Sequence, residues 1–94
     1  MIFDFEGTIL FWRGPAPYWF VPVPDGPSAV IQDLSSSLSY GWGVIPVRAC
    51  IGNTEWKTSL IPKDGRYLVP VKQAVQAAEG LQLGDTVHLK LTLG

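Results

Sequence analysis

The sequence predicts a mainly β fold with two short helices, arranged as a six-stranded closed or split β-barrel. Two observations predict the elements: several segments alternate apolar and polar residues, and two others place apolar residues at helical spacing. A third observation is that the two halves of the chain repeat one order of elements. With 94 residues, the chain has the length of one small domain. We therefore expect a single β-barrel domain over residues 1–94, with pseudo-repeats at about 1–51 and 54–94.

The first half begins with an alternating segment over residues 2–12, which predicts a strand. Its second face becomes apolar at Leu10 and Trp12, so we expect that end of the strand to be covered on both sides. Two prolines and a glycine within residues 13–17 end the strand, because proline cannot donate to a β-ladder. The remaining expected elements of this half are a short aromatic strand, a helix and an alternating strand, at residues 18–21, 27–38 and 44–51.

The second half follows the same order. Gly52-Asn53 predicts the tight turn of a hairpin. Gly80 is expected just after a helix, where a positive φ suits glycine. The expected elements are a strand at 55–61, a short strand at 66–69, a helix of about nine residues that begins at Pro70, and a strand at 87–93.

An internal repeat connects the two halves. Phe20-Val21-Pro22-Val23 and Leu68-Val69-Pro70-Val71 share one pattern at an offset of 48 residues. A single unit of about 45 residues buries too little apolar surface to be stable alone. Two such units about a pseudo-twofold axis could share a core and protect each other's sheet edges. This favours a barrel with a helix covering each end, and the alternative is an open antiparallel sheet with both helices on one face.

Composition excludes several classes of protein. Seven basic and eight acidic residues give a net charge of −1, which excludes a strongly basic protein that coats nucleic acid. One cysteine and one histidine exclude a disulfide framework, a thiolate-only zinc site and the usual histidine-rich metal sites. We expect no metal and no cofactor. Residues 1–6 lack the basic and apolar segments of a signal peptide, so we expect a cytoplasmic protein with no membrane partner.

The second half carries the motif of a known fold. Gly65-Arg66-Tyr67-Leu68-Val69-Pro70, a helix, and then Gly84-Asp85 before a strand resemble the AbrB/MazE swapped-hairpin domain over about 25 residues. That family contains DNA-binding transcription regulators and antitoxins. Two chains intertwine in its members, whereas here one chain would supply both halves.

The whole chain also resembles domain-of-unknown-function family 1905. This resemblance implies a fold similar to half-barrel antitoxin proteins and transfers no established reaction. Members of the family often stand before a YdeI/OmpD-associated domain, which the 94 residues do not contain. The matching segments are 18–24, Gly43 with Pro46-Val47, 55–62, 64–71 and 84–87.

No catalytic signature is evident, so we expect a protein that is not an enzyme. His88 alternates with the leucines of the last strand, which predicts a solvent-facing side chain with no nucleophile or orienting carboxylate in its motif. Cys50 has Arg48 on its face, and a quiet, partly buried thiol is the expected outcome. An unrecognised small hydrolase or isomerase that depends on His88 is the third hypothesis for function.

The tryptophans support the leading hypothesis. The chain has four, and Trp42 stands between two glycines in a connector, where an aromatic side chain can contact a ligand. We expect a non-catalytic module that binds a protein segment or a small ligand through a Trp-edged surface. The residues of this surface are Trp42, Arg48, Trp56, Lys57 and Arg66.

A DNA-binding regulator or antitoxin-like protein is the alternative. The AbrB/MazE resemblance implies contacts to DNA from the central hairpin and the turn that follows, at Lys57, Lys63 and Arg66. So few positive charges could neutralise few phosphates. We therefore expect an unknown protein or small molecule as the partner, in preference to nucleic acid. Because both halves lie in one chain, we expect a monomer, with a weak homodimer as the alternative.

Overall fold

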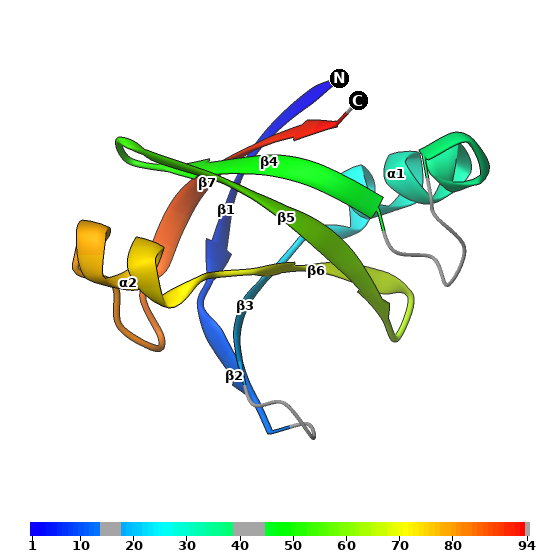
Figure 1. The fold of residues 1–94 in the computed structure, drawn as a ribbon. Helices are drawn as coiled ribbons and strands as arrows, with labels where there is room; N and C mark the ends of the chain where they lie inside the picture. Colours follow the sequence, from blue (N-terminus) through cyan, green and yellow to red (C-terminus); the bar gives the residue numbers. More distant parts are fainter. Residues whose placement is uncertain (14–17, 39–44, 94) are drawn as a thin grey trace.

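The computed structural model describes residues 1–13, 18–38 and 45–93 (Figure 1). It confirms a mainly β chain with two helices. The elements are β1 (Ile2–Thr8), β2 (Leu10–Trp12), β3 (Tyr18–Pro22), α1 (Asp25–Leu38), β4 (Ile45–Ile51), β5 (Thr54–Lys63), β6 (Arg66–Pro70), α2 (Gln73–Glu79) and β7 (Thr86–Leu93).

The strands form one curled sheet, in which every pairing is antiparallel. Seven strands follow the order β1-β7-β4-β5-β6-β3-β2, and the sheet curls into a half-barrel. Helix α1 lies at one end of the molecule and α2 at the other (Figure 1). The expected number of six strands is therefore wrong for the described residues, and a closed or split barrel is not confirmed.

The extra strand arises because residues 2–12 bend at Ile9. The side chain of Ile9 is 1% exposed. Its N–H donates to the carbonyl of Asp85, and its own carbonyl accepts from the N–H of Gly84, each at 2.9 Å. Before the bend β1 pairs with β7, and after it β2 pairs with β3. The two strands at the ends of the sheet order are thus neighbours in the sequence, which explains the strong curl.

Gly7 allows β1 to approach β3 closely. A Cβ atom on Gly7 would lie 2.5 Å from Cγ1 of Val21 and 3.3 Å from the carbonyl oxygen of Pro22. Real Cβ atoms do not approach other heavy atoms to 2.5 Å, so a side chain here would push the two strands apart. The absence of a side chain is therefore a requirement of the curl.

The core lies on the inner face of the sheet, as the alternating segments predict. Every second residue of β4 and β7 is buried. Phe20 is also buried but packs outside the main core, where its ring centroid lies 5.7 Å from those of both Trp12 and Tyr18. The buried residues of β4 and β7 are Ile45, Val47, Ala49, Ile51, Val87, Leu89, Leu91 and Leu93.

The helices begin and end close to their expected positions. Helix α1 begins at Asp25, two residues before the expected start. Helix α2 begins at Gln73 because Pro70 remains in β6, opposite Phe20. Gly80 adopts the expected left-handed conformation (φ 61°, ψ 39°) after α2, and its N–H bonds to the last turn. Of the helices described, neither has the length and apolar character needed to span a membrane.

Candidate binding surface

The residues expected to form the Trp-edged surface do not come together. Trp42 lies outside the described residues. Trp56 is buried, and Arg66 forms an ion pair near the start of α1. Arg48 and Lys57 are the two members that lie side by side, in paired strands.

Trp56 belongs to the core. Only 7% of its surface is exposed, and it lies opposite Ala49 on the inner face of the sheet. Its indole Nε1–H donates to the carbonyl oxygen of Pro70 at 3.0 Å, which satisfies the polar end of a buried tryptophan. The expectation that Trp56 contacts a ligand is therefore not supported by its position. Period-two alternation with the buried Leu60 is the sequence signal that could have placed it inside.

Arg48 and Lys57 form a basic pair on the outer face of β4 and β5. The two residues are direct cross-strand partners, and both side chains are exposed. Like charges directly opposite each other destabilise a sheet. Neither residue forms an ion pair with a carboxylate of the described residues. The pair borders a shallow pocket of about 290 Å³, which is lined by Arg48, Glu55, Trp56 and Lys57.

The surroundings of this basic pair are polar. Thr92 of β7 lies opposite Arg48 on the side away from Lys57. Lys90 lies two pairs further along β7, opposite Cys50. Glu55 is the acidic residue of the pocket lining. A guanidinium group and an ammonium group beside an open pocket can hold a carboxylate or a similar oxyanion.

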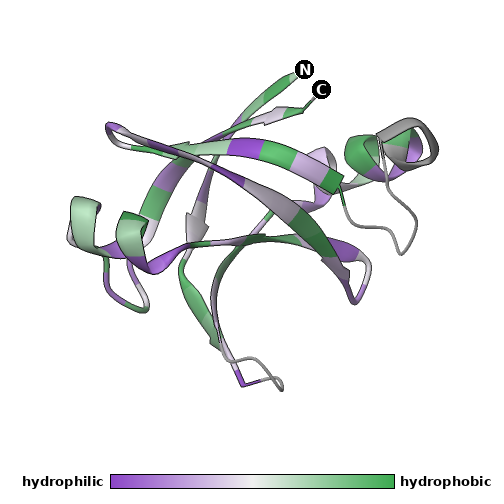
Figure 2. Ribbon diagram, in the orientation of Figure 1, coloured by the Kyte–Doolittle hydropathy of each residue, from purple (hydrophilic) through white to green (hydrophobic). Residues whose placement is uncertain are grey.

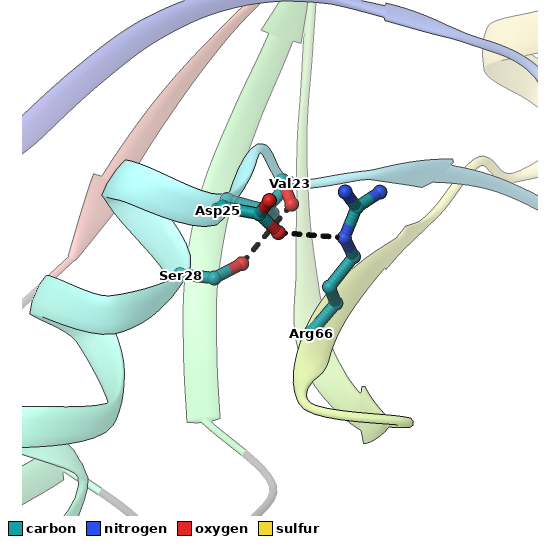
Figure 3. A network of polar contacts seen from close by, with 4 residues as sticks. All are labelled: Val23, Asp25, Ser28 and Arg66. Atoms are coloured by element: carbon teal, nitrogen blue, oxygen red, sulfur yellow. Dashed lines mark hydrogen bonds and ion pairs between the residues drawn. The ribbon is translucent and has the colours of Figure 1, made fainter.

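Arg66 and Lys63 are engaged with other side chains. Arg66 Nε donates to Asp25 Oδ1 at 2.9 Å, and this carboxylate sits in the first turn of α1 (Figure 3). In the same turn the buried Ser28 hydroxyl donates to the carbonyl of Val23 at 3.0 Å. Lys63 Nζ lies 4.2 Å from the centroid of the Trp12 ring. Of the residues expected to contact DNA, Lys57 is thus the one without such an intramolecular partner among the described residues.

The model of a family described as a domain of unknown function, DUF1905, matches residues 5–91. The chain belongs to this family. The match runs from β1 into β7, which confirms the resemblance to family 1905 noted from the sequence. The AbrB/MazE resemblance is not shown and stays a prediction. No curated protein matches the chain.

His88 and Cys50 of this DUF1905 domain lie on the outer face, as expected. His88 Nε2 lies 3.2 Å from Asp4 Oδ1, and both side chains are more than half exposed. The Cys50 thiol is partly buried and donates to the carbonyl of Gly52 at 3.5 Å. Within the described ranges, no three side chains of the His, Cys, Asp and Glu types gather as metal ligands.

The DUF1905 domain exposes a second surface that the sequence did not predict. Leu10, Phe11 and Trp12 of β2 are 49%, 44% and 38% exposed. The expectation that this end is covered on both faces is therefore wrong. The alternation of residues shows which face is apolar, but it does not show whether another element covers that face.

Proposed function

We propose that this domain is a non-catalytic binding module that holds an anionic group of a protein segment or small ligand against the outer face of β4 and β5. The observation that carries the proposal is the direct opposition of Arg48 and Lys57. Both side chains are exposed and form no ion pair with the described carboxylates. Trp56 is buried, so it takes no part in this surface.

Electrostatics explains why an anion suits this position. Cβ atoms of opposite residues in an antiparallel pair lie about 4.5–5.5 Å apart, so the two cations repel each other when nothing lies between them. A carboxylate placed between them would replace this repulsion with two attractions. Arginine can bind a carboxylate through two parallel hydrogen bonds, and lysine adds a point charge.

The size of the pocket restricts the ligand. A volume of about 290 Å³ lies just below the range of about 300–1,000 Å³ that is typical of small-molecule sites. The pocket could take a carboxylate group and the few atoms next to it. Glu55 in the lining would disfavour a ligand with many negative charges. An acidic side chain on a protein segment meets both conditions.

An NMR titration of the ¹⁵N-labelled chain tests the proposal. A short capped peptide with one glutamate is the first probe, and propionate is the second, which separates a protein segment from a small ligand. We expect shifts centred on Arg48 and Lys57, and affinity at least about threefold weaker in Arg48→Gln and in Lys57→Gln. Lys72→Gln is the matched control, because Lys72 is exposed at the start of α2. Shifts elsewhere, or equal affinity in all variants, would contradict the proposal.

The DNA-binding alternative has its own measurement. A regulator that uses Lys57, Lys63 and Arg66 would bind labelled double-stranded DNA at low salt, and its affinity would fall steeply as salt increases. The contacts of Lys63 with Trp12 and of Arg66 with Asp25 argue against it, because DNA would have to compete with both. We therefore expect no saturable binding in fluorescence anisotropy.

We also infer that the two halves of the chain are pseudo-repeats. In the pairing of β3 with β6, Val21 lies opposite Val69, its equivalent at the 48-residue offset. The flanking bonds are reciprocal: Val23 N–H donates to Tyr67 O, and Val71 N–H donates to Trp19 O, each at 2.9 Å. An experimental structure in which a twofold rotation fails to superpose the two halves would contradict this inference.

A further inference from the structure

Strand β2 is an edge strand that is apolar on both faces. It ends the sheet order and pairs on one side, with β3. All three of its residues are large, hydrophobic and exposed, and in Figure 2 the ribbon of β2 begins in green, the colour of hydrophobic residues. Natural proteins protect such an edge with charges, with proline or with a covering element. None of the three residues of β2 is charged or proline.

Ile9 determines which backbone groups of β2 are free. Its N–H and carbonyl bond to Asp85 and Gly84, just before β7 begins at Thr86. Backbone groups of successive residues in a strand point to opposite edges. The backbone N–H and carbonyl groups of Leu10 and Trp12 therefore point toward β3. Those of Phe11 point to the opposite edge, which β7 does not reach. Among the described residues, the Phe11 backbone has no bond outside the β2–β3 ladder.

The two ends of this free edge carry opposite charges. Arg13 follows β2 directly and is exposed. Asp85 lies beside Ile9 at the other end, and its carboxylate accepts a hydrogen bond from the N–H of Gln82 at 2.9 Å. Neither side chain forms an ion pair with the described residues.

We propose that β2 pairs with β2 of a second copy of this chain, antiparallel and centred on Phe11, in a weak dimer. In this register each Phe11 lies opposite the other, and Leu10 lies opposite Trp12 of the second copy. Arg13 then meets the loop that carries Asp85 of the second copy. Each apolar side chain faces another, and each charge faces its opposite, as a twofold interface requires.

The loop before β7 restricts the pairing to this register. Gly84 and Asp85 occupy the edge at Ile9, so no incoming residue can pair there. Three residues remain, and any shift of the second strand along this edge would leave fewer of them paired. The register centred on Phe11 is the one that uses the whole edge.

The available area makes this dimer weak. Less than half of each of the three side chains is exposed, which corresponds to roughly 100 Å² for each. The pairing would bury about 300 Å² per copy, against about 800 Å² per partner in stable complexes. We therefore expect a dissociation constant on the order of 0.1–1 mM and a monomer at low micromolar concentration. The residues involved differ from Arg48 and Lys57, so this inference and the proposed function can fail independently.

Cysteine cross-linking tests both the pairing and its register. In a Cys50→Ser background, Phe11→Cys would place two thiols opposite each other. The Cα atoms of this hydrogen-bonded pair would lie about 5.5 Å apart, within the range for a disulfide. Leu10→Cys is the matched control, because its equivalent in the second copy is displaced by two residues along the strand, beyond about 7 Å. With glutathione disulfide as oxidant, we expect the Phe11→Cys dimer to form at least about tenfold faster.

Sedimentation equilibrium of the unmodified sequence from about 10 µM to about 1 mM gives the second readout. We expect dimer at the highest concentrations, and loss of it in Phe11→Lys, with unchanged circular dichroism because Phe11 is exposed. Equal cross-linking rates, a monomer at all concentrations, or a dimer that persists in Phe11→Lys would each overturn the proposal. If β2 pairs instead with a strand of another protein, the purified chain stays monomeric and uncross-linked, which also overturns it.

Discussion

Strands β1 and β2 belong to one run of chain, yet their side chains face solvent in opposite ways. β1 pairs with β7 over seven residues and exposes Asp4 and Glu6 in its middle, after an exposed Ile2 at its start. β2 pairs with β3 over three residues and exposes Leu10, Phe11 and Trp12. A further strand beside β1 would have to desolvate two carboxylates, and this cost disfavours pairing. β2 presents no such barrier.

The difference arises at one residue. Ile9 binds the loop before β7 through both of its backbone groups, and beyond it β7 no longer accompanies the chain. Protection of a sheet edge is therefore a local property that depends on which partner is present at each residue. It follows that β1 should contribute to the fold, whereas the exposed side chains of β2 should contribute mainly to association.

The largest expected effect is at the bend itself. Ile9→Ala should lower the free energy of unfolding by about 2–5 kcal/mol, because it leaves a cavity where a side chain is 1% exposed. Leu10→Ala, one residue later and 49% exposed, should change it by less than about 1 kcal/mol. Urea denaturation followed by circular dichroism measures both. Equal losses for the two variants would show that β2 supports the fold as strongly as the bend does.

The sequence predicted the elements well and the curl less well. Alternation located the strands on either side of the Gly52-Asn53 turn, and Gly80 ended α2 as expected. Residues 2–12 alternate too, so they were predicted as one strand. The bend at Ile9 depends on hydrogen bonds to Gly84 and Asp85, more than seventy residues away, which no local pattern reveals.

The candidate site was predicted in part. Arg48 and Lys57 flank a tight hairpin at positions that the turn places opposite each other, so their pairing follows from the sequence. The face of Trp56 was also readable from alternation with Leu60. The ion pair between Arg66 and Asp25 could not be predicted from the sequence, because it depends on how α1 packs beside β6.

The second prediction tests the closeness of β1 to β3. Gly7→Ala should lower the free energy of unfolding by about 1–3 kcal/mol, because the new methyl group would overlap Cγ1 of the buried Val21. Gly26→Ala is the matched control in α1, where a Cβ atom meets nothing within 4 Å. Thermal unfolding should show stability unchanged or slightly raised in that control. A neutral Gly7→Ala would mean that the curl is looser than the structure shows.

The third prediction concerns the contacts that hold Trp12 on β2. Lys63 Nζ stands 4.2 Å from its ring centroid, an arrangement worth about 0.5–1 kcal/mol at an exposed site. A double-mutant cycle with Trp12→Leu and Lys63→Met should give a coupling energy of that size. No measurable coupling would indicate that Trp12 is free to turn toward a partner, which would sharpen the contrast with the charged side chains of β1.

The smallest expected effect is at the contact between Asp4 of β1 and His88 of β7. Asp4→Asn removes the charge beside His88, and both side chains are more than half exposed to water and salt. Such pairs contribute about 0–1 kcal/mol, and we expect a change in the free energy of unfolding below about 0.5 kcal/mol. Urea denaturation at low and at high salt measures it, with Glu6→Gln as the control on the same face of β1. A loss above about 1 kcal/mol would mean that Asp4 holds β1 to β7. A small loss of stability would indicate that the charge of Asp4 mainly protects the sheet edge. A carboxylate can disfavour pairing with a foreign strand without stabilising the native pairing with β7.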